Sequence, residues 1–167
     1  SDGTLIPLVT DSAAWSHLTT PAYCWYKNDA ATFKDTYGAY YNWYTVNTGK
    51  LCPMGWHIPT YTECVTLLTY LGGQMVAGGK IKEAGTTHWL APNTGATNES
   101  GFTGLPGGLR DDFAYFWPPN LIYGGDDGYW WMSSEIDGDN AYAFYLFSSS
   151  TQLWVGPIKK GYGFSIR

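Results

Sequence analysis

Aromatic residues make up 18% of the 167-residue chain, whereas charged residues make up only 14%, about half of the usual share. A disordered chain would show the opposite balance, so the composition predicts a folded protein that forms one domain over residues 1–167. The net charge of −5, with nine scattered basic residues, argues against nucleic acid as a partner, and no apolar run approaches the roughly 20 residues needed for direct membrane insertion.

The first half of the chain predicts an extended start followed by short helices. Residues 1–26 are expected to be extended, and Asp29 as N-cap with Gly38 as stop signal predicts a helix over residues 29–37. Thr60 and Glu63 are spaced as a capping box, so a further helix is expected to begin there. Its buried face is expected to contain Val65, Leu67, Leu68 and Leu71. Its end is expected at Gly72 and Gly73.

The second half predicts β-structure after a long, turn-rich segment. A short helix is expected over residues 75–84, weakened by two central glycines, and residues 85–128 then show little periodicity. Strands are expected over residues 128–134, 141–147, 152–155 and 161–167. The second of these is apolar on both faces, so it is either buried on both sides or exposes an apolar surface. Helices first and an antiparallel sheet last predict an α+β fold.

The three cysteines leave the redox state open. Because the count is odd, at least one of Cys24, Cys52 and Cys64 is free or has a partner beyond this sequence. One bridge, between Cys24 and Cys52 or between Cys52 and Cys64, would suit an exported protein, and three buried thiols are the alternative. The abrupt ends of the chain favour a mature fragment or an excised domain.

Several motifs occur together in one order along the chain. They read YCWYKND (23–29), YGAYYNWY (37–44), CPMGWHIPT (52–60), AGGKIKE (77–83), NTGATNESGF (93–102), LPGG (105–108), YWWMSSE (129–135) and GFSIR (163–167). With these motifs the sequence resembles the Fibrobacter succinogenes major paralogous domain, a family of bacterial surface and secreted domains. The resemblance implies an extracellular location and a C-type-lectin-like fold, with two helices packed on a twisted antiparallel sheet and long loops.

The chain also departs from the family pattern. Cys64 stands where the family usually has Trp, and residues 141–160 are aromatic and aliphatic where the family is usually rich in Asn. This exchange resembles lectin-fold proteins that are diversified by retroelements, which suggests a variable protein. The PT-x-x-E helix and the GF-x-x-R segment resemble formylglycine-generating enzymes too, but no cysteine follows residue 64, so the cysteine pair of those enzymes is missing.

Neither catalysis nor a cofactor is expected. His17, His57 and His88 are far apart and lie outside metal-ligand spacings, and Cys64 sits among apolar helix positions. Half of the acidic residues fall between 111 and 139, where glycine-rich loops could supply calcium ligands. The calcium candidates are Asp126, Asp127, Asp137 and Asp139. Since their spacing is not that of an EF-hand and the signatures of sugar-binding lectins are missing, a solvated acidic rim is the alternative.

The remaining candidates are late aromatic residues that cannot all be buried. Exposed Trp and Tyr give a large contact area at low entropic cost, so they suit recognition surfaces. The predicted ligand-binding residues are Tyr115, Trp117, Tyr123, Tyr145, Phe147 and Trp154. We therefore expect a non-enzymatic module of a bacterial surface adhesin or pilus-tip protein that binds a glycan or protein ligand on another cell or surface. The alternatives are a structural pilus subunit, or an accessory module related to formylglycine-generating enzymes or polysaccharide-degrading systems.

Overall fold

The computed structural model describes residues 5–117 and 125–166, which form a mixed α+β protein with antiparallel sheets. The helices are α1 (Ser12–Ser16), α2 (Ala30–Tyr37), α3 (Trp43–Val46), α4 (Tyr61–Tyr70) and α5 (Gln74–Ile81), with a 3₁₀ turn η1 (Tyr26–Asn28). The strands are β1 (Tyr23–Cys24), β2 (Tyr40–Tyr41), β3 (Leu109–Arg110), β4 (Phe116–Trp117), β5 (Asp127–Glu135), β6 (Asn140–Phe147) and β7 (Trp154–Lys159). The expectation of an α+β fold is confirmed.

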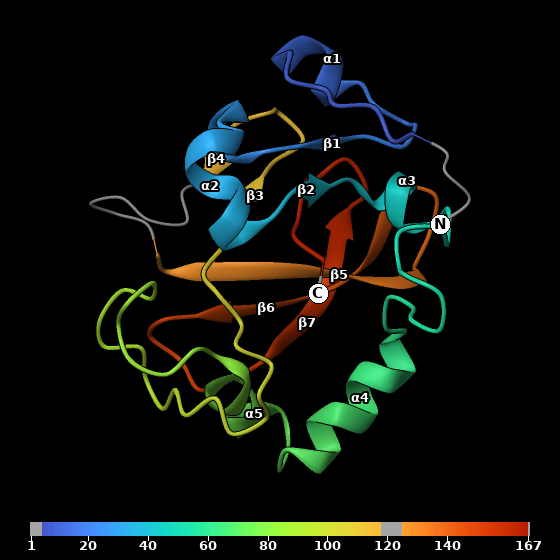
Figure 1. Ribbon diagram of the computed structural model, residues 1–167. Coiled ribbons are helices and arrows are strands. Elements are labelled where there is room, and N and C mark those ends of the chain that lie inside the picture. The colour runs from blue at the N-terminus through green and yellow to red at the C-terminus, as the bar shows by residue number, and fades with distance from the viewer. Residues whose placement is uncertain (1–4, 118–124, 167) are drawn as a thin grey trace.

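A three-stranded sheet in the order β5-β6-β7 divides the molecule into two layers. Figure 1 shows α4 and α5 on one side of this sheet, and α1 to α3 with the two-stranded sheets β1-β2 and β3-β4 on the other. Because side chains alternate along a strand, each side of the sheet contributes to a different core. The side that packs on α4 and α5 is called the helical face, and the side that carries Tyr129, Trp131 and Tyr145 is called the open face.

The central strand β6 is apolar on both faces because both faces are packed. Phe144 and Leu146 point into the helical layer, whereas Ala141 and Ala143 pack against the opposite layer. The strands predicted over residues 128–134 and 141–147 therefore exist with nearly those bounds, and β7 begins two residues later and runs four residues further than predicted. The strand predicted over residues 161–167 was wrong for the described residues, because that segment makes isolated bridges to three different elements and no continuous ladder.

Helix α4 begins as the sequence predicts but buries a different face. The Thr60 hydroxyl accepts from the Glu63 backbone N–H and the Glu63 carboxylate accepts from the Thr60 backbone N–H, which confirms the capping box. The positions that pack into the core are Cys64 and Leu71, which are buried, and Leu68, which is half-buried; they are spaced by four and three residues along one helical stripe. The expectation for Val65 and Leu67 was wrong, because both are exposed beside that stripe.

The other helices follow their local signals closely. Asp29 caps α2 by accepting the Thr32 N–H, and Gly38 ends it at a φ of +71°, as predicted. Helix α5 begins one residue earlier and ends three residues earlier than the predicted 75–84, because Lys82 has an extended backbone. The expectation of an extended start missed α1, which Asp11 caps by accepting the Ala14 N–H.

The long segment after α5 is fixed by buried groups more than by regular structure. Arg110 on β3 is fully buried, and its guanidinium donates to the backbone carbonyls of Val9 and Thr10 at 3.0 and 3.2 Å. The same guanidinium lies 4.4 Å from the ring centroid of Trp15 and 4.7 Å from that of Phe116. The N-terminal layer is thus tied to the late part of the chain by one buried cation.

All three cysteines are free thiols, with Cys24 and Cys64 buried and Cys52 half-buried. The alternative of a disulfide bridge was therefore wrong for this chain. Within residues 5–117 and 125–166, no helix is both long enough and apolar enough to span a bilayer.

Candidate binding surface

Three aromatic side chains at one end of the open face contact one another. The rings of Tyr145 and Trp154 are parallel to within 7°, with their centroids 6.4 Å apart. Phe147 stands nearly perpendicular to both rings, at 5.8 Å from Tyr145 and 6.4 Å from Trp154. Trp154 is 38% exposed and the other two side chains are half-buried. We call these three residues the aromatic corner.

The strand register explains why these rings meet. Tyr145 lies opposite Trp154 on β7 and opposite Tyr129 on β5, and opposed side chains of an antiparallel pair share one face at about 5 Å. The Tyr129 and Tyr145 rings are stacked at 5.5 Å. The Tyr145 hydroxyl lies over β7 at Gly156, where a Cβ would be in ordinary van der Waals contact with it at 3.5 Å. The row of rings therefore crosses all three strands.

The remainder of the open face is covered by the C-terminal segment. Phe164 is fully buried and packs on Tyr129 at 5.1 Å and on Trp131 at 4.5 Å between ring centroids. Trp43 of α3 covers the same layer and donates its indole N–H to the Met132 carbonyl at 2.9 Å. The aromatic corner is thus the continuation of a packed face towards solvent.

A buried lysine fixes the turn that joins β6 to β7. The ammonium of Lys82 donates to the backbone carbonyls of Thr94, Phe147 and Ser150 at 3.0, 3.0 and 2.9 Å. It also lies 5.4 Å from the ring centroid of Trp89. Because one of these carbonyls belongs to Phe147, the lysine holds the backbone of the aromatic corner from the helical side.

Two helix glycines bring the same turn close to α5. A Cβ at Gly78 would lie 2.4 Å from the Gln152 carbonyl oxygen, and a Cβ at Gly79 would lie 2.3 Å from the Gly95 carbonyl oxygen. The Gly79 N–H donates to the Thr151 carbonyl at 3.0 Å. Glycine is required here because no other residue allows the backbones to approach so closely.

Tyr115 and Trp117 lie on a separate hairpin formed by β3 and β4. Both are exposed, and the buried Asp111 carboxylate orders their segment by accepting the Tyr115 N–H at 2.8 Å and the Trp117 indole N–H at 2.9 Å. Within the described part of the chain, no ring contact joins this hairpin to the aromatic corner. The sixth predicted residue, Tyr123, lies outside the described residues.

Two of the four calcium candidates lie beside the aromatic corner. Asp127 is opposite Phe147 in the β5–β6 register, and its carboxylate accepts the Tyr129 hydroxyl at 3.2 Å. Burial raises the pKa of Asp127 to about 6. The Asp126 carboxylate accepts the hydroxyl of Ser148, which follows the corner on β6. The Asp127 carboxyl group therefore borders the rings on the β5 side.

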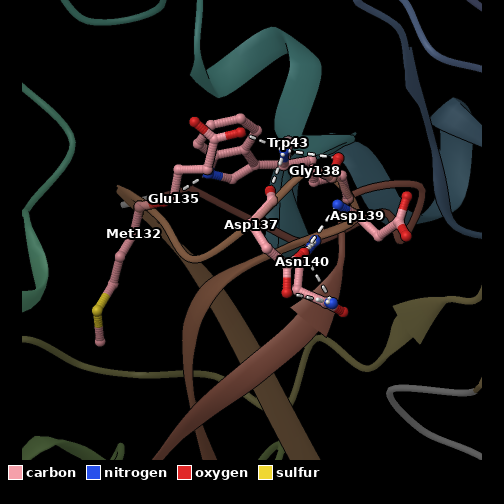
Figure 2. A network of polar contacts seen from close by, with 8 residues as sticks. Trp43, Met132, Glu135, Asp137, Gly138, Asp139 and Asn140 are labelled. Atoms are coloured by element: carbon pink, nitrogen blue, oxygen red, sulfur yellow. Dashed lines mark hydrogen bonds and ion pairs between the residues drawn. The ribbon is translucent and has the colours of Figure 1, made fainter.

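The other two calcium candidates lie at the opposite end of β5, in the turn to β6 (Figure 2). The Asp137 carboxylate accepts the backbone N–H groups of Asp139 and Asn140, both at 2.8 Å. The two pairs of candidates are separated by a nine-residue strand, roughly 30 Å long, so they cannot share one ion. The described residues contain no cluster of three or more potential metal ligands.

A second buried lysine closes this turn. The ammonium of Lys160 donates to the carbonyls of Asp137 and Gly138 at 2.7 and 2.8 Å and to the Glu135 carboxylate. It lies 4.8 Å from the ring centroid of Trp43. Lys82 and Lys160 therefore hold the two ends of the central sheet in the same way, with an aromatic ring on one side and oxygen atoms on the other.

Two thiols are buried, and two imidazoles contact neighbouring carboxylates. Burial raises the pKa of Cys24 and of Cys64 to about 11, so both thiols stay protonated near neutral pH. His57 lies 2.8 Å from a Glu63 carboxylate oxygen, next to the capping box, and His88 contacts Glu83 at 2.9 Å. None of these groups faces the aromatic corner.

Sequence reasoning missed two features of the surface. Tyr129 joins the row of rings, and its position two residues after Asp127 on a predicted strand was the available signal. Met54 and Trp56 are 99% and 76% exposed in the CPMGWH motif. Trp56 lines a pocket of about 430 Å³ together with Tyr41, Leu51, Cys52, Pro53, His57 and Ile166.

Comparison with known proteins identifies one family. A family model described as the Fibrobacter succinogenes major domain matches residues 1–167. The comparison with curated proteins gave no match, and neither did the comparison with solved structures. The matched region includes the central sheet, α4, α5 and the aromatic corner.

Proposed function

The chain belongs to the Fibrobacter succinogenes major domain family, and from this premise we propose that it is a non-enzymatic recognition module. It acts outside the cell, as part of a bacterial surface adhesin or pilus-tip protein, and binds a glycan or protein ligand. The aromatic corner, extended by Tyr129, makes the contact.

The observation that carries this proposal is the partial exposure of three neighbouring rings on a rigid support. Tyr145, Phe147 and Trp154 belong to strands whose turn is held by the buried ammonium of Lys82. Rings presented without loop mobility lose little conformational entropy on binding, which is how aromatic residues contribute affinity at recognition surfaces.

The surroundings of the reactive side chains support binding without catalysis. The two buried thiols have raised pKa values, and His57 and His88 are engaged by neighbouring carboxylates. A nucleophile needs an adjacent base or a lowered pKa, and the thiols of Cys24 and Cys64 have the opposite setting.

We further propose that the fold is C-type-lectin-like. The support is the arrangement of α4 and α5 on one side of a twisted antiparallel sheet, with the long segment between α5 and β5 packed around its edge (Figure 1). A fold of this kind hosts many unrelated partners, so the ligand has to be identified from the surface chemistry.

The composition of residues 141–160 supports diversification of this segment by a retroelement. The corner residues Tyr145, Phe147 and Trp154 all fall within it. A template repeat and a reverse-transcriptase gene beside this gene in its source genome are the expected finding, and a genome without both removes this part of the proposal.

A second candidate function is assembly, in which the domain docks a neighbouring subunit. It is favoured by the exposed Met54 and Trp56 beside the pocket of about 430 Å³. Contiguous exposed apolar side chains of this kind are typical of protein contact sites.

Binding assays on the full chain separate the two candidates. A glycan array and a pull-down from bacterial surface extracts are carried out with and without chelator, using the parent, Trp154→Ala and Trp56→Ala. Recognition through the aromatic corner predicts that Trp154→Ala alone loses the ligand. Loss only in Trp56→Ala, with capture of a sister subunit, would favour assembly.

A further inference from the structure

The three rings of the aromatic corner surround one point. Their centroids are 5.8, 6.4 and 6.4 Å apart, and one ring stands nearly perpendicular to the other two. A group placed up to about 4 Å above this triangle lies within about 6 Å of all three centroids, the range over which a ring face attracts a cation. Ring faces carry negative electrostatic potential and ring edges carry positive potential, so a cation is favoured where it reaches an exposed face of one of these rings.

The charged groups beside the aromatic corner also favour a positively charged ligand. Asp127 lies opposite Phe147, and among the described residues no lysine or arginine is within ion-pair distance of its carboxylate. The sequence contains no lysine or arginine between residues 111 and 158. The ammonium of Lys82, which reaches the Phe147 carbonyl, is fully buried against backbone carbonyls, and Lys159 at the far end of β7 is paired with Asp112 at 2.7 Å. The corner therefore has a carboxylate on its border, and no lysine or arginine of the described residues lies over its rings.

The protein uses this combination of rings and oxygen atoms elsewhere to hold cations. Lys82, Arg110 and Lys160 each lie 4.4 to 5.4 Å from the centroid of a tryptophan ring and donate to carbonyl oxygens. In each case a cation is stabilised by a π-face and by oxygen acceptors at the same time. The aromatic corner presents the same two components at the surface.

We propose that the aromatic corner binds a cationic side chain, the ammonium of a lysine or the guanidinium of an arginine, on a protein ligand. This rests on the proposed function, since it names the ligand chemistry of that same surface. The cation contacts an exposed ring face of the aromatic corner, and the Asp127 carboxylate lies on the same side of the sheet, on β5 opposite Phe147. A neutral ligand would leave this half-buried carboxylate without a compensating charge.

The test uses peptides that differ only in the probe residue. Glycine–serine peptides carrying three spaced lysines, norleucines, arginines or citrullines are titrated into the full chain by calorimetry at fixed ionic strength. The lysine and arginine peptides are expected to bind at least tenfold more tightly than their uncharged counterparts. Trp154→Ala and Tyr145→Ala each weaken the charged peptides about three- to tenfold, because each removes one ring face.

Matched variants separate this site from general attraction to an acidic protein. Asp127→Asn is expected to weaken the lysine peptide at least fivefold, whereas Glu99→Gln, an exposed acid on another loop, leaves binding within twofold. Tyr70→Ala removes an 85%-exposed ring on α4 and serves as the ring control. Circular dichroism and the thermal midpoint establish that each variant is folded.

Four outcomes overturn the inference, and two of them also bear on the proposed function. Equal binding of the norleucine and lysine peptides, or equal effects of Glu99→Gln and Asp127→Asn, refutes a cation site at the corner. Binding of neutral glycans that is lost in Trp154→Ala refutes the cationic ligand but leaves the recognition function standing. If neither peptides nor glycans respond to any change in the corner, both proposals fail.

Discussion

Replacement of Gly78 by alanine tests whether α5 supports the β6–β7 turn. By helix propensity alone, alanine at an internal helix position is more favourable than glycine by about 1 kcal/mol. The structure predicts the opposite result, because the new Cβ would lie 2.4 Å from the Gln152 carbonyl oxygen and 2.8 Å from that of Thr151. Both are backbone atoms, so no rotamer change can relieve the overlap.

The magnitude follows from the contacts that the turn must give up when it moves away. The Gly79 N–H donates to Thr151, the Thr151 hydroxyl donates to the Met75 carbonyl at 2.7 Å, and the Leu153 N–H donates to the Gln74 carbonyl at 2.9 Å. At about 1 kcal/mol each, their loss costs about 3 kcal/mol. After the gain in helix propensity, the free energy of unfolding is expected to fall by about 2 kcal/mol.

Urea unfolding followed by tryptophan fluorescence, with the thiols kept reduced, measures this difference. For a domain of this size the loss corresponds to a thermal midpoint roughly 4–8 °C lower. Gly138→Ala is the control, because Gly138 has open space around its Cβ direction and an ordinary φ. The reasoning is refuted if Gly78→Ala is as stable as the parent, or more stable.

Further predictions concern the cap, the carboxyl group and the rings. Thr60→Ala removes the α4 cap and is expected to cost about 1 kcal/mol at pH 7. The Thr60 backbone N–H, which alanine keeps, is the main cause that lowers the pKa of Glu63 to about 2. The contribution of Glu63 is therefore complete above about pH 4.5 and is lost in both proteins as the pH falls towards 2, so the difference between parent and variant should change little in acid melts. Asp127→Asn is expected to raise stability by about 1–3 kcal/mol at pH 7 in urea titrations, since the folded pKa of about 6 lies above the unfolded value of 3.8. That gain should shrink as the pH falls below 6 and vanish below about pH 3, where the carboxyl is protonated in both states. Trp154→Ala should lower the unfolding free energy by less than about 1.5 kcal/mol, whereas Phe164→Ala, which removes a fully buried ring, should lower it by about 3–5 kcal/mol; equal losses would show that the corner is core.

Local signals in the sequence were sufficient for the helix starts and the main strands. The α4 capping box and the Asp29 cap depend on residues within four positions of one another, so they could be predicted without knowledge of the fold. The buried face of α4 could not, because Cys64 is buried by its position under the sheet and Val65 is exposed by the same orientation. Hydrophobicity alone does not distinguish these two neighbours.

The glycines of α5 show why tertiary contacts escape such reasoning. Gly78 and Gly79 indicate a weak helix when only propensity is considered. In the structure they are the positions where two distant loops approach the helix backbone. No local sequence pattern indicates this approach, since the contacting residues Gly95 and Gln152 lie far along the chain.

The candidate surface was predicted in part. Aromatic enrichment identified Tyr145, Phe147 and Trp154 as residues of interest, but their mutual contact depends on the β6–β7 register. Tyr115 and Trp117 were grouped with them because they are late and aromatic, whereas the structure places them on a separate hairpin ordered by Asp111. Grouping by sequence region therefore combined two surfaces.

The hydrogen bonds of Lys82 bear on which substitutions the domain can accept. The hydrogen bonds of its ammonium to residues 147–150 go to main-chain oxygens, which every amino acid supplies, so it holds this segment whatever side chains the segment carries. A scaffold anchored in this manner tolerates exchange of its exposed residues without refolding. New binding specificities can then arise by substitution of exposed residues in this segment, while the fold that supports the segment stays the same.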